Sequence, residues 1–381
     1  MHLLIILFLL LPIISLDEAS TNSFLRFYSE DTYSKYFLLF LLFSLQFIAA
    51  PIQAGFSDFY CRKKNLILAV IITIGSMALL FISLNYAGFL FLFAFILKAC
   101  LGNITPIARA GLADTSLKKN FRLSIGLSTV AIGVGYFILV LLNDFLNNSL
   151  VIITVLLLTV IGLIFLIIKF KDLRDKDAKT IHGTILNDIR SIFTHFLNNK
   201  SFLLALATYA FWETAFYQLF LRDADIKNSN FKFTAVAMCL GYFIGVALLG
   251  FSKKSDLKNI KVGCGITLSS FALLIMISNF IQTSLVFEAL FYGVAALGYG
   301  FFTPSLFSHI SQDRQPHEQG KIYGLIDSVD SLAFTVAFFI ALITKVTHYY
   351  FILFSSFILI LVGYFIFLVA HRHLQGKAYH E

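Results

Sequence analysis

Apolar segments long enough to cross a lipid bilayer recur from one end of the sequence to the other, separated by short polar breaks. A spanning helix needs roughly 20 apolar residues, because each residue advances about 1.5 Å through a hydrocarbon layer about 30 Å thick. Only 13% of the 381 residues are charged, about half of the share in a soluble domain. The chain is therefore expected to be an all-α integral membrane protein, in which each span satisfies its own backbone hydrogen bonds.

Twelve spans are predicted from these segments. Their ranges are 1–27, 35–57, 65–84, 87–112, 122–142, 149–168, 201–222, 232–252, 260–279, 285–309, 322–345 and 350–370. The opening stretch MHLLIILFLLLPIISL is similar to the apolar core of a signal peptide, but no basic region precedes it and no small-residue cleavage site follows. It is kept as the first span.

Basic residues set the expected orientation of these spans. Clusters at 62–64, 118–122, 169–179 and 253–261 all fall on one side, and the other side carries few Lys and Arg. The positive-inside rule places the basic side, and both termini, in the cytoplasm. The formal charge of +8 then follows from topology, so nucleic acid is not expected as a partner. Short loops and the frequent use of Phe, Ile, Asn and Lys favour a bacterial inner membrane.

One long polar interruption, residues 169–200, divides the chain near its middle. We predict an N-terminal six-helix bundle at 1–168, a cytoplasmic linker at 169–200, a C-terminal six-helix bundle at 201–370 and a cytoplasmic tail at 371–381. Within the linker, ILNDIRSIFTHFL has apolar residues at helical spacing, which predicts an amphipathic helix on the membrane surface. A tether is favoured over a regulatory site there.

Three landmarks recur in the two halves. Gly-Phe-Ser occurs at 55–57 and again at 250–252, each time at the end of an apolar segment and before basic residues. GNITP at 102–106 and GFFTP at 300–304 are followed at equal distance by Gly126 and Gly324. Such self-similarity predicts a parallel repeat of six helices, related by a pseudo-two-fold axis.

The stretch AGFSDFYCRK, residues 54–63, resembles the signature G-x-L-A-D-R-x-G-R-K/R between helices 2 and 3 of the major facilitator superfamily. Asp58, Arg62 and Lys63 stand at its acidic and basic positions, and Gly55 lies one place late. Phe59 and Cys61 replace the usual Arg and Gly. KACLG, residues 98–102, is similar to the helix-4 signature R-x-x-x-G of the family, with Lys in place of Arg.

This resemblance implies two six-helix bundles around a central cavity, which work by alternating access. The family's antiporter signature contains Gly-Pro, whereas IGLSTVAIGVGYF at 125–137 contains no proline. A drug/proton antiporter is therefore disfavoured.

The resemblance also suggests a gate on the cytoplasmic side. We expect Asp58 to face the positive N-terminal end of the eleventh span and to pair with Arg109, while Arg62 reaches Asp114. The alternative is that these are ordinary interfacial charges. The predicted gating residues are Gly55, Asp58, Arg62, Lys63, Arg109 and Asp114.

Acidic residues inside the spans are the main candidates for substrate or proton binding, because a charge there costs about 2.5 to 3.5 kcal/mol on insertion scales. Glu213 lies near mid-span beside Trp212, and the repeat places either Glu18 or Asp17 opposite it in the first span. A carboxyl removed from water is readily protonated, which suits a proton-coupled symporter. Alternatively, hydrogen bonds from Tyr209 or Tyr217 hold Glu213 as a structural acid.

Three further charges lie within spans. Lys98 is expected near the bilayer centre, where it binds an anionic group of the substrate or, as we favour, neutralises one of the acids. Asp327 and Asp330 are three residues apart and share a helix face. They either line the pathway or hydrate the start of the helix.

We predict a secondary active transporter that takes up a small polar metabolite by proton coupling. The alternative is an exporter of a drug-like or siderophore-like molecule, and more distant readings are a non-transporting sensor and a membrane-embedded enzyme. No Walker loop, catalytic set or metal-ligand cluster is evident, and the four cysteines are scattered. We therefore expect no catalytic residue, no metal and no cofactor beyond the proton gradient. The expected partners are the substrate and membrane lipid, and the expected state is a monomer.

Overall fold

The computed structural model is helical throughout the part of the chain that it describes, and that part contains no strand. The described residues are 2–27, 32–59, 61–84, 88–116, 120–169, 199–223, 229–280, 285–311, 318–344 and 349–378. The predicted amphipathic helix of the linker lies outside these residues and stays a prediction.

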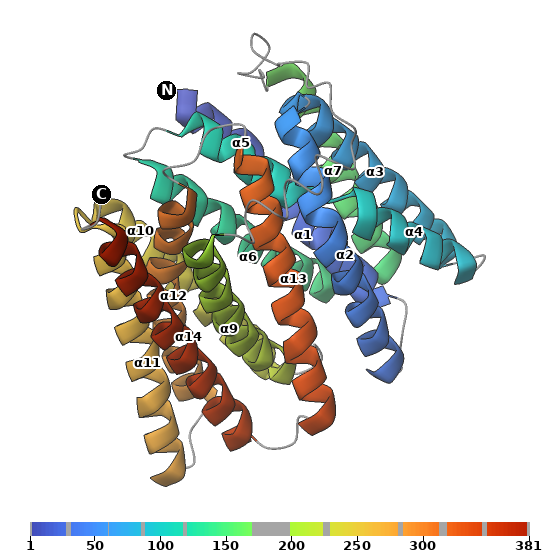
Figure 1. The fold of residues 1–381 in the computed structure, drawn as a ribbon. Coiled ribbons are helices and arrows are strands. Elements are labelled where there is room, and N and C mark those ends of the chain that lie inside the picture. Colours follow the sequence, from blue (N-terminus) through green and yellow to red (C-terminus); the bar gives the residue numbers. More distant parts are fainter. Residues whose placement is uncertain are drawn as a thin grey trace. The chain divides into compact units, whose positions relative to one another are not determined.

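The chain divides into two compact units. Unit 1 comprises Met1–Thr184 with Arg314–Ser331, and unit 2 comprises Ile185–Asp313 with Leu332–Glu381. The helices of unit 1 are α1 (His2–Phe27), α2 (Thr32–Phe59), α3 (Arg62–Ser83), α4 (Gly88–Leu101), α5 (Ile104–Thr115), α6 (Phe121–Phe145) and α7 (Asn148–Lys169) (Figure 1). The helices of unit 2 are α9 (Lys200–Asp223), α10 (Ser229–Phe251), α11 (Asp256–Phe280), α12 (Leu285–Ser311) and α14 (Tyr349–Ala378). The helix α13 (Gln319–Thr344) contributes its first part to unit 1 and its second part to unit 2.

The helices match the twelve predicted spans one for one when α4 and α5 are counted as a single interrupted span. Within the described residues, ten helical segments are long and apolar enough to cross a membrane. Helix α14 runs eight residues further than its predicted span and includes the start of the predicted tail. The chain is an all-α membrane protein of twelve spans in two six-helix repeats.

Helix packing repeats in the two halves. Helix α4 packs against α2 and α3 as α12 packs against α10 and α11, and α7 packs against α1 and α3 as α14 packs against α9 and α11. The equivalent pairs occur in the same chain order, so the repeat read from three landmarks extends to the tertiary structure.

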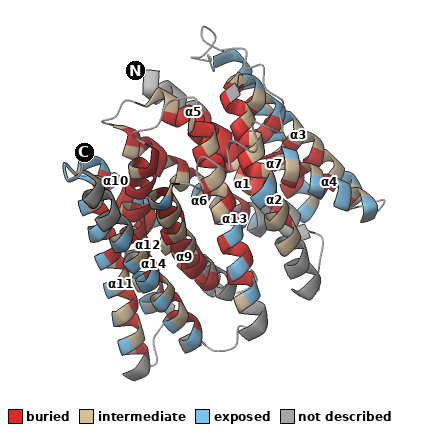
Figure 2. Cartoon of the chain, viewed as in Figure 1, coloured by how far each residue is buried: buried red, intermediate tan, exposed pale blue. Residues whose placement is uncertain are grey.

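The pattern of buried and exposed residues is that of a protein surrounded by lipid. Figure 2 shows buried residues on the inner sides of the helices and exposed residues along α4 and α11. The exposed residues include large apolar side chains such as Phe89, Phe93, Ile164, Leu273 and Met276. In water such a surface would be unfavourable, but hydrocarbon tails solvate it.

Close helix contacts in unit 2 depend on glycine. A Cβ atom placed on Gly241 of α10 would lie 1.9 Å from the carbonyl oxygen of Gly293 in α12. No side chain fits at that distance, so the two backbones approach closely only because residue 241 is glycine.

Candidate functional site

The fourth span is interrupted between α4 and α5, at residues 102 and 103, just before Pro106. Pro106 has no N–H, so the carbonyl of Gly102 loses the helical donor it would have had four residues on. Asn103 bonds back to the Ala99 carbonyl through its side chain at 3.1 Å, and its own N–H donates to Oε1 of Gln53 at 3.1 Å. Polar side chains therefore replace the helical bonds at the break.

Asp17 of α1 lies at the N-terminal end of α5. Its Oδ2 accepts hydrogen bonds from the N–H of Thr105 at 3.0 Å and from the hydroxyl of Thr105 at 2.9 Å. The N–H of Thr105 is one of the donors left over at a helix start, and the positive end of the helix favours a carboxylate there. Asp17 thus caps α5 from a different helix.

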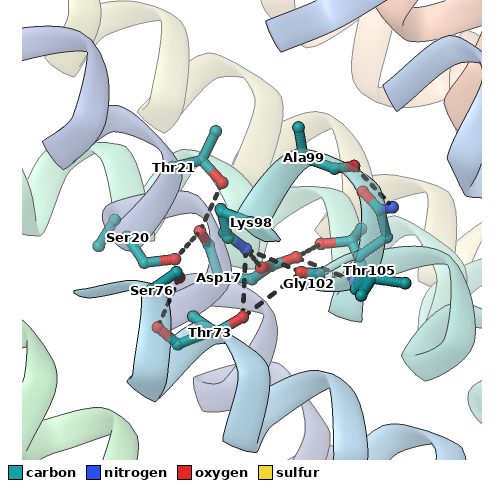
Figure 3. A network of polar contacts seen from close by, with 12 residues as sticks. Asp17, Ser20, Thr21, Thr73, Ser76, Lys98, Ala99, Gly102 and Thr105 are labelled. Carbon is teal, nitrogen blue, oxygen red and sulfur yellow. Dashed lines mark hydrogen bonds and ion pairs between the residues drawn. The ribbon is translucent and has the colours of Figure 1, made fainter. Parts of the chain in front are cut away.

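Lys98 of α4 completes this arrangement. Its ammonium pairs with Oδ1 of Asp17 and also donates to the Gly102 carbonyl at 2.8 Å and to Oγ1 of Thr73 at 3.4 Å. Lys98 is 1% exposed and Asp17 is 7% exposed. Figure 3 shows the two side chains pointing toward one another beside the break. Of the two roles considered for Lys98, the ion pair with Asp17 corresponds to the neutralisation of an acid.

The two acids considered in the first span, Asp17 and Glu18, differ in burial. Asp17 is buried in this network, whereas the neighbouring Glu18 is half-buried and turned about 100° around the helix. Asp17 is therefore the acid of α1 that joins a polar site with Lys98.

Glu213 of α9 lies in an aromatic environment in unit 2. The hydroxyl of Tyr299 in α12 donates to its Oε1, and both residues are buried. Trp212 is fully buried and stacks on Phe302 with the ring centroids 3.9 Å apart. One hydrogen bond to Glu213 therefore comes from another helix, α12. The bonds expected from Tyr209 or Tyr217 stay a prediction.

Three of the residues proposed as a gate, Asp58, Arg62 and Asp114, lie together near the start of α13. Oδ1 and Oδ2 of Asp58 accept hydrogen bonds from the backbone N–H groups of Gly320 and Lys321, both at 2.8 Å. Arg62 pairs with Asp58 at 2.7 Å and also with Asp114. The predicted contacts of Asp58 with the helix end and of Arg62 with Asp114 are present.

Arg109 has a different partner from the expected one. It pairs with Asp327 of α13 at 3.0 Å and donates to Ser128 and Thr129 of α6 at 3.2 and 3.0 Å. Asp58 pairs instead with Arg62, which lies four residues further along the chain at the start of α3. The proposed Asp58–Arg109 pair is thus replaced by two separate ion pairs.

The remaining predicted residues lie around these pairs. Gly55 is buried near the end of α2, and Lys63 donates to the carbonyl of Ile167 at the end of α7 at 3.0 Å. Asp330 is half-buried, one turn beyond Asp327. Of the described residues, no group of three or more His, Cys, Asp or Glu is arranged to hold a metal ion.

Several residues of the site were not predicted from the sequence. Thr73, Thr105 and Tyr299 supply hydrogen bonds to the buried charges, and Gln53 holds the break in the fourth span. Thr105 lies within the repeated GNITP stretch, which was the one available signal. A threonine or tyrosine is common in any span, so the type alone does not reveal these roles.

Two repeats of six spanning helices, buried ion pairs inside the spans and a broken fourth helix define a membrane transport protein of the repeat-built class. The sequence matches the family model described as Major Facilitator Superfamily over residues 6–338. The chain therefore belongs to the major facilitator superfamily, and it is a membrane transporter of that fold.

Solved structures similar to the chain are transporters. The human organic anion transporter MFSD10 (TETRAN) has a TM-score of 0.73 at 16% identity, with 95% of this chain and 97% of that chain covered. A bacterial homologue of the iron transporter ferroportin has a TM-score of 0.77 at 11% identity, covering 98% and 100%. The fucose:proton symporter FucP of E. coli has a TM-score of 0.67 at 18% identity, covering 96% and 97%. These likenesses concern the fold. No curated protein sequence matches the chain.

Proposed function

We propose that this transporter couples the uptake of a small polar metabolite to the proton gradient, by alternating access. The observation that carries the proposal is Glu213, a buried carboxyl of α9 that accepts a hydrogen bond from Tyr299 of α12. An acid inside a span is costly, and it is retained where it has a task in transport.

Proton binding at Glu213 is expected to change how α9 packs against α12. As a carboxylate, Glu213 only accepts hydrogen bonds, whereas the protonated acid also donates one. The change alters the contact of α9 with Tyr299, which packs against Phe216 with ring centroids 4.4 Å apart. Protonation of Glu213 therefore changes the packing of α9 on α12 directly.

The gate provides a second element of the proposal. Asp58, Arg62 and Asp114 tie α2, α3 and α5 to the start of α13, and Arg109 ties α5 and α6 to Asp327 further along α13. These charge-assisted bonds are formed in one conformation and must break when α13 moves away from α2 and α5. We propose that they stabilise one state of the transport cycle.

The setting of this function is part of the proposal. We place the protein in a bacterial inner membrane as a monomer, with both termini in the cytoplasm, membrane lipid around it and the proton gradient as its only cofactor. Transport, and not catalysis, is the proposed activity.

The first experiment identifies the substrate. The purified protein is screened by thermal unfolding against amino acids, peptides, sugars, organic acids and siderophores, with Glu213→Gln in parallel. A ligand that binds only the folded state stabilises it, by about 2.7 kcal/mol when the ligand is in hundredfold excess over Kd. The melting temperature rises as a result. We expect a hit whose binding is lost or made independent of pH in Glu213→Gln.

A second experiment tests coupling and direction. The hit is offered to proteoliposomes with and without an inward proton gradient, and we expect accumulation only with the gradient. A hit that binds Glu213→Gln unchanged removes Glu213 from the mechanism. Accumulation that ignores the gradient contradicts proton coupling, and a hit expelled from cells in exchange for protons supports the exporter alternative.

A further inference from the structure

The ammonium of Lys98 is surrounded by oxygen atoms from three parts of unit 1. These oxygens are Oδ1 of Asp17 in α1, the main-chain carbonyl of Gly102 at the helix break, 2.8 Å from Nζ, and Oγ1 of Thr73 in α3, 3.4 Å from Nζ. We call this group of Asp17, Gly102 and Thr73 the oxygen cage. Because the Thr73 hydroxyl also donates to the Gly102 carbonyl at 3.5 Å, its lone pairs are left to face the cation.

An ordinary ion pair would need only the carboxylate. Here the carbonyl of Gly102 is available because Pro106 cannot donate to it, and it lies at the C-terminal end of α4, where the helix dipole favours a cation. Gly102 also has no room for a side chain, since a Cβ atom would lie 2.9 Å from Cδ of Lys98 and 3.0 Å from Oγ1 of Thr73. The backbone at Gly102, and not only the side chain of Asp17, therefore forms part of the binding site of the ammonium.

The other half of the repeat provides an internal comparison. When GNITP is aligned with GFFTP, the position of Lys98 corresponds to Ala296. There α12 continues through Pro304 without interruption, from Leu285 to Ser311. The broken helix and the buried lysine occur together in one half and are both missing from the equivalent described segment of the other.

A carboxylate, a hydroxyl and a carbonyl freed at a helix break are the ligand types with which discontinuous membrane helices bind alkali-metal cations. We infer that the oxygen cage is a site for a monovalent cation, with the Lys98 ammonium as its resident ion. A tethered ion cannot exchange with solution, so the wild-type protein binds neither Na⁺ nor K⁺ at this place.

The test removes the tethered ion and asks whether a free one replaces it. Lys98→Ala empties the cage and leaves the Asp17 carboxylate without its counter-charge. Lys98→Met removes the same charge but fills the space with an unbranched apolar chain, so it is the matched control. The full-length proteins, in lipid nanodiscs, are unfolded by heat in NaCl, KCl or N-methyl-D-glucamine chloride at equal ionic strength.

We expect Na⁺ or K⁺ to raise the melting temperature of Lys98→Ala by several degrees over N-methyl-D-glucamine, with a saturable concentration dependence. Wild type and Lys98→Met should melt at the same temperature in all three salts. Adding Asp17→Asn to Lys98→Ala should abolish the response, because the charged ligand is lost.

The inference is overturned if Lys98→Ala melts alike in the three salts, or if Lys98→Met responds as strongly as Lys98→Ala. Should Lys98→Ala fail to give folded protein, Lys98→Ser is measured in the same way, and an equal melting temperature in the three salts is then decisive against the site. No substrate is needed for this test. Its failure therefore leaves proton-coupled uptake untouched, and a failure of proton coupling leaves the cation site untouched.

Discussion

Asp17 and Lys98 are two opposite charges held almost entirely away from water within one unit. Each ion would cost several kcal/mol to bury alone, and the pair is tolerated because Asp17 is also bonded by Thr105 and Lys98 by Gly102. The sequence favoured Lys98 as the group that neutralises an acid, but which acid it meets depends on the register of α1 against the break.

Replacing one partner of this pair should be much worse than replacing both. We expect Asp17→Asn to destabilise the folded state by about 3 to 5 kcal/mol, because it leaves a buried ammonium without a counter-charge. Asp17→Asn combined with Lys98→Met should recover much of that loss. Thermal unfolding of the single and double variants measures this, with exposed Lys64→Gln as the control. Equal melting temperatures for Asp17→Asn and Lys64→Gln would contradict the prediction.

At the scale of helices, the start of α13 is held by a carboxylate of another helix. Asp58 satisfies two of the first N–H groups of α13, and Gly320 allows the approach, since a Cβ atom there would lie 2.2 Å from the Ala54 carbonyl oxygen. Loss of this contact should free the end of α13 from α2.

We therefore expect Asp58→Asn to shift the conformational equilibrium toward the state in which the gate is open. The readout is the maleimide labelling rate of Cys61, which lies between Asp58 and Arg62, in a variant whose other three cysteines are serine. Labelling should become faster and the transport rate should change. If both rates equal those of the parent protein, the ion pairs are ordinary interfacial contacts and not a gate.

Helix packing in unit 2 gives a prediction of stability. Gly241→Ala should lower the melting temperature markedly, because its Cβ would lie 1.9 Å from a backbone carbonyl and force α10 away from α12. Gly265→Ala is the matched control, since nothing lies within 4 Å of a Cβ atom at that helical position. A drop of the same size in both variants would show that the close approach is not the cause.

At the scale of the whole molecule, an even number of spans and the asymmetric basic clusters predict that both termini are cytoplasmic. A green fluorescent protein fused to the C-terminus should fluoresce, and alkaline phosphatase fused there should be inactive. The same reporters placed after residue 147, between the fifth and sixth spans, serve as the opposite control. An active C-terminal phosphatase would require an odd number of spans or the reverse orientation.

The fold persists at 11% to 18% identity with solved transporters. Such conservation of architecture does not need particular residues, because apolar spans, small residues at helix contacts and loop charges are sufficient to place the helices. Substrate and coupling depend instead on a few polar side chains, so they do not follow from the fold.

The sequence by itself determined the number of spans, the expected orientation, the six-helix repeat and most of the charges that matter. These properties depend on local composition and spacing, such as the two Gly-Phe-Ser stretches and the GNITP and GFFTP pair. Only the tertiary structure decided that Asp17 caps α5 and pairs with Lys98, that Arg109 takes Asp327 and not Asp58, and that Tyr299 bonds Glu213. The reason is that a hydrogen bond between distant helices depends on the register and rotation of those helices. A neighbouring side chain along a span can carry the same chemical group but points in a different direction.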